Sequence, residues 1–135
     1  MTVRRIDYYY VTVPDAPGGG RRVFSSLAER GVNLLAVLAF PVGDGKSQVD
    51  LVPEDPAALE SAAGQAGLEL SPRKHAFLVQ DDDRVGAMAE VAGKLADAGI
   101  NVTAAAAVAA GNGRYGMLLW VSPADYETAA TVLGA

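Results

Sequence analysis

Two short sets of residues could bind a small polar ligand. Each set has an aspartate and a glycine just before a predicted helix and an asparagine just after it. Free N–H groups at the start of a helix favour a carboxylate, and glycine lets a ligand approach the backbone closely. The aspartate could pair with an ammonium group, and the asparagine offers both a donor and an acceptor. The two sets are Asp15, Gly18 and Asn33, and Asp83, Gly86 and Asn101.

Each of these residues also has a structural explanation. The glycines could serve only a turn, and the aspartates could cap a helix, which is their commoner role. The asparagines could satisfy the backbone near the end of the helix. Both interpretations, structural and ligand-binding, stay open for each residue.

The sequence contains no arrangement that is typical of catalysis. It has no cysteine, which excludes a thiol nucleophile, a zinc finger, an iron–sulfur cluster and a disulfide scaffold. Its one histidine, His75, follows Arg73 and Lys74, and Ser25 and Ser26 have no base near them in the sequence. No two groups are placed for acid–base or nucleophilic chemistry. We therefore expect a protein that is not an enzyme.

Two other segments resemble ion-binding motifs only in part. Asp81, Asp82 and Asp83 could hold a divalent cation, but adjacent carboxylates on an extended segment do not all point one way. The glycine and arginine run at 18–22 could cradle a phosphate at a helix start. It lacks the lysine and the Ser or Thr of a phosphate-binding loop. We therefore expect no metal and no cofactor.

The chain repeats itself at a fixed offset, with most matches at glycine or turn positions. The turn at 43–46 falls on the turn at 111–114 without a gap. This pattern indicates a duplicated small domain, with one repeat at 1–72 and the other at 73–135. Further matches are Gly18 with Gly86, Leu27 with Leu95, Gly31 with Gly99 and Asn33 with Asn101.

Each repeat begins with a strand and an amphipathic helix. The strand is predicted at 6–13 in the first repeat and at 75–80 in the second, from its β-branched and aromatic residues. A loop of turn-forming residues follows, and then a helix with apolar residues at helical spacing. Gly31 and Gly99 come just after these helices, where a left-handed C-cap belongs.

The rest of each repeat is a hairpin and a second helix. Two strands flank Gly-Asp-Gly in the first repeat and Gly-Asn-Gly in the second, which are typical of hairpin turns. The alanine run at 104–110 has helix propensity, but its alignment with the strand-like segment 34–40 and the matching glycines that flank both segments predict a strand. The second helix begins near Asp55–Pro56 and near Ser122–Pro123. Only the first repeat continues into a fourth strand, at 67–70.

This order of elements is the ferredoxin-like βαββαβ plan, an α+β fold with helices on one face of an antiparallel sheet. We expect two such repeats in tandem, the second lacking its last strand. The strand near Phe77 and Val79 would then be an open edge, and open edges are usually covered or paired. We predict that another strand pairs there, from a second chain or from the other repeat.

Both repeats resemble the ACT domain. The second repeat carries Asp83–Gly86, a helix that ends in Leu95–Gly99, and Ile100–Val102. The first repeat carries Asp15–Gly18 and, at the end of its helix, Leu27–Asn33. The resemblance covers nearly the whole chain as two tandem copies. ACT domains are regulatory modules that sense ligands, usually amino acids.

The resemblance implies an effector site between paired domains. The loop after the first strand, the start of the first helix and the asparagine after that helix would contact the effector. Val85 replaces the proline of the family pattern, and Gly19 and Gly20 are additional in the first loop, so one of the two sites could have lost binding. By motif matching the contact residues are Asp15, Pro17, Gly18, Asn33, Asp83, Gly86 and Asn101.

These observations favour a non-catalytic regulatory module that binds a free amino acid, forms a homodimer and acts on a separate protein target. A second hypothesis is a structural or protein-interaction module of the same fold without a ligand. A third is a small enzyme that uses the groove between the domains.

The charge and hydropathy of the chain argue against two other classes of partner. The formal net charge is -5 at pH 7, and the basic spots, such as Arg4–Arg5, are short, so nucleic acid is not expected. No apolar run approaches the roughly 20 residues that span a bilayer, and the N-terminus lacks the apolar segment of a secretory signal. We expect a cytoplasmic protein without membrane partners.

Overall fold

The chain forms two compact units that share its first strand. The computed structural model describes residues 1–135. The insert unit is Asp7–Lys74, and the outer unit combines Met1–Ile6 with His75–Ala135. These units do not coincide with the repeats at 1–72 and 73–135, because Met1–Ile6 lie with the second repeat.

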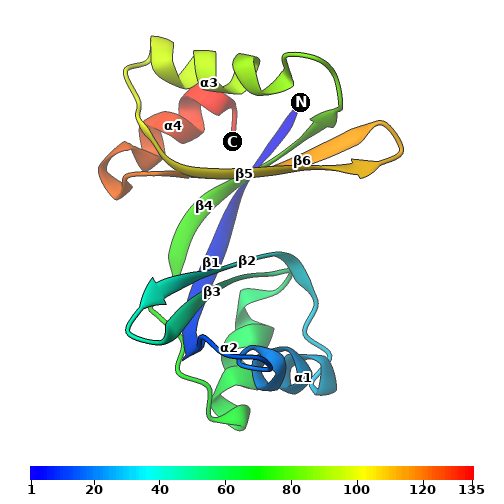
Figure 1. Cartoon of the computed structure of the whole chain (residues 1–135). Helices are drawn as coiled ribbons and strands as arrows, with labels where there is room; N and C mark the ends of the chain where they lie inside the picture. The colour runs from blue at the N-terminus through cyan, green and yellow to red at the C-terminus, as the bar shows by residue number, and fades with distance from the viewer. The chain divides into compact units, whose positions relative to one another are not determined.

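The insert unit has two helices on one face of a small antiparallel sheet (Figure 1). Strand β3 is central, and its Leu51 lies opposite Tyr9 of β1 and Val37 of β2. Val23 and Leu27 of the first helix and Leu59 of the second complete the core under this face. The elements are β1 (Thr2–Pro14), α1 (Arg21–Glu29), β2 (Leu34–Gly43), β3 (Lys46–Pro53) and α2 (Pro56–Ala66).

The outer unit repeats this plan. Its β4 and β5 pair with β6 in antiparallel register, and α3 and α4 cover the sheet (Figure 1). β1 is the other neighbour of β4, and its first residues, Thr2–Ile6, belong to this unit. The elements are β4 (Lys74–Asp82), α3 (Ala87–Asp97), β5 (Val102–Gly111), β6 (Arg114–Val121), a 3-10 turn (Pro123–Asp125) and α4 (Tyr126–Leu133).

The structure confirms the predicted α+β ferredoxin-like plan and explains the strand that the second repeat lacks. The start of β1 lies beside β4, and its Val3 packs against the core of the outer unit. The edge predicted to be open at Phe77 and Val79 is therefore paired by a strand of the other repeat, one of the two sources expected.

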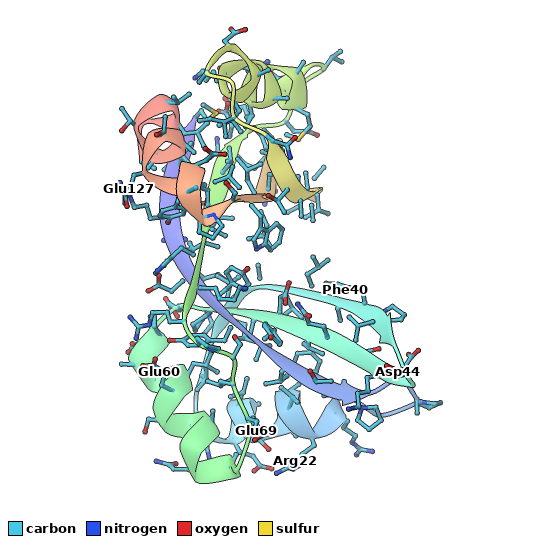
Figure 2. The ribbon with its side chains drawn as sticks, turned by 90° about the vertical axis from the view of Figure 1, so that its left-hand side faces the viewer. Arg22, Phe40, Asp44, Glu60, Glu69 and Glu127 are labelled. Carbon is cyan, nitrogen blue, oxygen red and sulfur yellow. The ribbon has the colours of Figure 1, made fainter.

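The hairpins have two-residue turns with positive φ at both positions. Asp44 and Gly45 have φ of 53° and 69°, and Asn112 and Gly113 have 56° and 69°. Such turns match the twist of the flanking strands, and Asp, Asn and Gly tolerate this backbone best. Figure 2 shows Asp44 at the tip of the first hairpin. The alanine run lies in β5, which pairs with β6 along its length. It is therefore a strand, as the alignment of the repeats predicts, despite its helix propensity.

The predicted fourth strand at 67–70 is wrong. Gly67 ends α2 with a φ of 68°, and the N–H of Leu68 donates to the carbonyl of Ala63, which ties this residue to the helix. The chain returns to β1 only at Ser71, whose N–H donates to Tyr10 O at 2.9 Å. The turn chemistry at the end of α2 therefore prevents a longer ladder.

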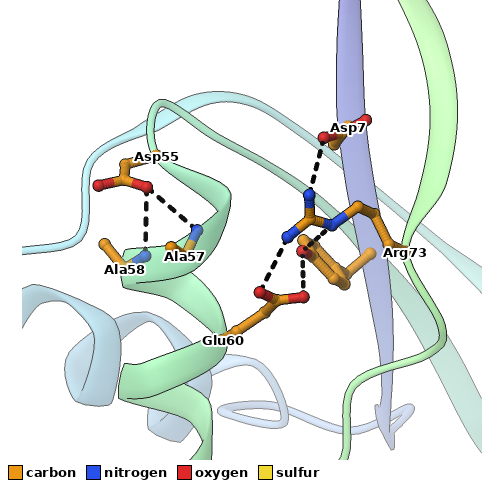
Figure 3. A network of polar contacts seen from close by, with 7 residues as sticks. Asp7, Asp55, Ala57, Ala58, Glu60 and Arg73 are labelled. Carbon is orange, nitrogen blue, oxygen red and sulfur yellow. Dashed lines mark hydrogen bonds and ion pairs between the residues drawn. The ribbon is translucent and has the colours of Figure 1, made fainter.

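A buried tyrosine joins the two ends of the insert unit. Tyr9 is 1% exposed, and its hydroxyl donates to Glu60 Oε1 at 2.8 Å and accepts from Arg73 Nε at 3.0 Å. The Arg73 guanidinium also reaches Glu60 Oε2 at 2.9 Å and Asp7 Oδ2 at 3.4 Å (Figure 3). Burial, and then the bond to Glu60, raises the pKa of Tyr9. We call this network the Tyr9 clasp.

Replacing Tyr9 with phenylalanine should destabilise the protein by about 1–2 kcal/mol, because both hydrogen bonds of the hydroxyl are lost. Tyr10→Phe is the matched control, since no hydrogen bond of its hydroxyl is present. The free energy of unfolding in urea measures both changes. Equal stability of the two variants would show that the clasp contributes nothing.

One charged side chain is buried in the insert unit. Asp50, on β3, is 5% exposed and accepts a hydrogen bond from Gln48 Nε2 at 2.9 Å. Burial raises the pKa of Asp50, while the bond from Gln48 and the positive charge of Lys74 oppose that change. The charged form is therefore less favourable in the folded state than in the unfolded state.

Asp50→Asn should raise the melting temperature at pH 7, because it removes the cost of burying a charge. A raised folded pKa means that the contribution of Asp50 to stability is fully present below the unfolded pKa, about 3.9, and is lost as the pH rises through the folded value. The difference between variant and wild type should therefore vanish below about pH 4. Asp44→Asn removes an exposed charge as a control. A lower melting temperature for Asp50→Asn at pH 7 would contradict this assignment.

Candidate ligand-binding site

The aspartates of the two predicted sites anchor loops and do not cap helices. The N–H of Asp15 donates to Gly45 O, and the N–H of Asp83 donates to Gly113 O, each at 2.8 Å. The carboxylate of Asp15 accepts from Ser47 Oγ at 3.2 Å. The N-cap residues are Gly20 for α1 and Gly86 for α3, and neither helix has a side-chain cap. The capping explanation is therefore wrong for both aspartates.

The loop that follows β1 is tight and exposed. A side chain at Gly19 would place its Cβ 2.1 Å from the carbonyl oxygen of Pro14, so only glycine fits there. Gly18 has a φ of 80°, and a Cβ built on it meets nothing within 4 Å. Pro17 and Gly18 both lie open to solvent at the entrance to α1. A ligand can therefore approach the backbone at this point.

The starts of α1 and α3 differ in charge. The first turn of α1 has no acidic residue and begins with Arg21 and Arg22. The first turn of α3 contains Glu90, which pairs with Arg84 and lies 3.8 Å from Lys94. A carboxylate of the protein itself therefore lies at the start of α3, whereas the start of α1 remains favourable for an external anion.

The two asparagines lie at the starts of β2 and β5. Asn33 donates from Nδ2 to Glu54 Oε2 at 3.1 Å, and its carbonyl accepts from the N–H of Glu54 at 3.0 Å. Asn101 is exposed just before β5. Asn33 thus ties the ends of β2 and β3 together and keeps its amide oxygen available.

A single unit does not bring the predicted site residues together. Asp15 lies at the hairpin end of β3, beside Gly45, whereas Asn33 lies at the opposite end, beside Glu54. The length of β3, Lys46–Pro53, separates them by roughly 20–25 Å at about 3.3 Å per residue. Asp83 and Gly86 are separated from Asn101 in the same way by β6. A site that combines the loop aspartate with the asparagine therefore requires a second domain.

Strand β2 is an edge strand without any charged residue. Val37 is 43% exposed and Val42 is 50% exposed, and Leu35 and Phe40 are also open to solvent. Natural edge strands are usually protected by lysine, by a bulge or by a covering element. β2 has Pro41 and a register shift near each of its ends, but its middle, Ala36–Phe40, has neither a charge nor a bulge and is therefore open to pairing with another strand.

The aspartates at 81–83 do not gather at one point. Asp81 lies 3.4 Å from the N-terminal amine of Met1, and Asp82 pairs with Arg114 at 2.8 Å. No group of three His, Asp or Glu side chains is arranged to hold a metal ion. None of the helices has both the length and the apolar character needed to cross a bilayer.

Motif matching missed a groove of about 550 Å³ in the insert unit. It lies between β1, the start of α1 and the segment 67–71, and Arg22 and Glu69 line it (Figure 2). Arg22 belongs to the run at 18–22 that resembles a phosphate cradle in part, whereas Glu69 has no spacing that predicts a function. The failure of 67–70 to pair with β1 creates the groove, and that could not be inferred from the local sequence.

Several solved structures share the whole fold, although no family model and no curated protein matches the sequence. Protein BT0572 from Bacteroides thetaiotaomicron has a TM-score of 0.84 at 17% identity, over 98% of this chain and 88% of that one. The ligand-free regulatory subunit of aspartate kinase from Thermus thermophilus has a TM-score of 0.65 at 18% identity, over 98% and 93%. That subunit from Thermus flavus has a TM-score of 0.56 at 25% identity, over 99% and 95%. The chain therefore has the ACT-type fold of aspartate kinase regulatory subunits.

Proposed function

We propose that this chain is a non-catalytic regulatory module that binds a free amino acid. The effector lies between the loop after β1 of one insert unit and Asn33 of the insert unit in a second copy. The observation that carries this proposal is the placement of Asp15 and Asn33 at opposite ends of the β2–β3 hairpin. The fold shared with regulatory subunits of aspartate kinase supports it.

A twofold pairing of β2 with the β2 of a second copy would unite the two ends. In an antiparallel pair, the Leu34 end of one strand lies beside the Gly43 end of the other. That arrangement places Asn33 of one copy near the Asp15 loop of its partner, and the symmetry makes two equal sites. The exposed apolar side chains of β2 would be buried in the same step.

The groups on each side complement an amino acid. The N–H groups of Arg22 and Val23, in the first turn of α1, suit its carboxylate, since helices leave their first N–H groups without internal partners. The carboxylate of Asp15 suits its ammonium group, and the amide of Asn33 adds a donor or an acceptor. We assign binding to the insert unit because Glu90 makes the start of α3 less favourable for an anion.

Calorimetric titration of the wild type and of variants at the named residues tests the amino-acid proposal. Each of the free amino acids is titrated into the protein, and any that binds is repeated with variants. Asp15→Ala and Asn33→Ala should each weaken binding about tenfold, because each removes a charged or amide contact. Asp83→Ala and Asn101→Ala are matched controls at the equivalent positions of the outer unit and should bind as the wild type does.

Two outcomes would contradict the proposal. Binding of no amino acid at millimolar concentration would favour a protein-interaction module of the same fold. Loss of binding in the Asp83 and Asn101 variants alone would place the site in the outer unit.

Val37→Lys should convert the dimer to a monomer, because it places a charge in the edge that pairs. Val108→Lys makes the same change on β5, the other edge strand, where Val108 is 67% exposed, and should remain a dimer. Light scattering after gel filtration gives the mass of each. A dimeric Val37→Lys variant, or a monomeric wild type, would overturn the proposed pairing.

A further inference from the structure

The groove in the insert unit has a strand edge along one side. Tyr10 directs both its N–H and its carbonyl to Ser71, at 2.9 Å each, and so away from β3. β1 pairs with β3 without a register shift from Tyr9 to Pro14, so Thr12, two residues further on, presents its N–H and carbonyl on the same side as Tyr10. No backbone hydrogen bond joins Thr12 to the segment 67–70 across the groove. One donor and one acceptor of β1 therefore face the groove.

The other lining groups complement a peptide. Val13, Leu68 and Leu70 pack against the core and form an apolar surface. Arg22 is held by a 2.8 Å hydrogen bond from Nη2 to Ala66 O, which leaves its other N–H groups available. Glu69 is exposed and lines the same groove. A cation, an anion and a strand edge therefore line the same groove as this apolar surface; Figure 2 labels Arg22 and Glu69.

We propose that this groove binds a short peptide in extended conformation. Its backbone adds a strand to β1 at Thr12, its terminal carboxylate pairs with Arg22, and its terminal amine pairs with Glu69. Strand addition takes affinity from main-chain hydrogen bonds and selectivity from alternate side chains. A volume of about 550 Å³ lies in the range of drug-sized ligands and exceeds the need of a single amino acid. The groove shares the first turn of α1 with the proposed amino-acid site, but Thr12 and the segment 67–71 belong to the groove alone, so changes at those residues test it separately.

The first test is a titration of the ¹⁵N-labelled full chain with the tripeptide Ala-Val-Ala, followed by amide chemical shifts. We expect shifts concentrated at Thr12, Gly19, Arg22 and the segment 67–71, and slower hydrogen exchange of the Thr12 amide. The same peptide acetylated at its N-terminus and amidated at its C-terminus should bind about tenfold more weakly, because it lacks both charges. Free alanine should leave Thr12 and the segment 67–71 unshifted.

Variants distinguish what the strand edge of β1 contributes to peptide binding from what the charges of Arg22 and Glu69 contribute. Arg22→Gln and Glu69→Gln should each weaken the tripeptide about tenfold. Arg21→Gln, an exposed change in the same turn of α1 and outside the groove, is the control and should bind normally. Thr12→Pro removes only the N–H that faces the groove and should abolish binding, whereas Thr12→Val keeps that N–H and should bind.

Three results would overturn the proposal. These are no shifts with millimolar peptide in 10-fold excess over the protein, equal shifts of Thr12 and the segment 67–71 with free alanine, or unchanged affinity in both Arg22→Gln and Glu69→Gln. The charge variants and the end-blocked peptide decide the question even where Thr12→Pro does not fold.

Discussion

β1 is a member of both compact units, and the rest of the structure depends on how this strand is divided. Its first residues lie beside β4 and complete the sheet of the outer unit, while Tyr9–Pro14 pair with β3 in the insert unit. The insert unit therefore begins at Asp7 and ends at Lys74. The Tyr9 clasp joins both of these points to α2, through a hydroxyl that is buried and hydrogen-bonded on both sides.

Much of the fold could be predicted from local chemistry. Glycines with positive φ mark the turns and helix ends in both repeats. The alignment of the repeats led to the correct prediction of a strand for the alanine run of β5, which helix propensity alone would have made a helix. The strand expected at 67–70 was wrong because Gly67 and Leu68 close the end of α2 instead. The place of Met1–Ile6 depends on pairing with a strand far along the chain, and short-range patterns contain no information about such a partner.

The sequence selects candidate site residues but does not say which of them lie together. The resemblance to ACT domains selected Asp15, Gly18 and Asn33, and the structure places them in exposed positions around α1. Only the strand pairing shows that the length of β3 separates Asp15 from Asn33. Arg22 belongs to a run that resembles a phosphate cradle in part, but Glu69 could not be selected from the sequence. Exposed charged residues are common, and the groove exists only because the segment 67–70 does not pair with β1.

The composite site between two copies is tested most directly by mixing subunits. Asp15→Ala and Asn33→Ala proteins are each titrated alone with the amino acid that the wild type binds, and then titrated after unfolding and refolding together. Each heterodimer then contains one site with both residues intact. The mixture should therefore recover wild-type affinity at about a quarter of the sites, while each variant alone stays weak. Weak binding in the mixture, with heterodimers present, would show that Asp15 and Asn33 do not share a site across the two chains.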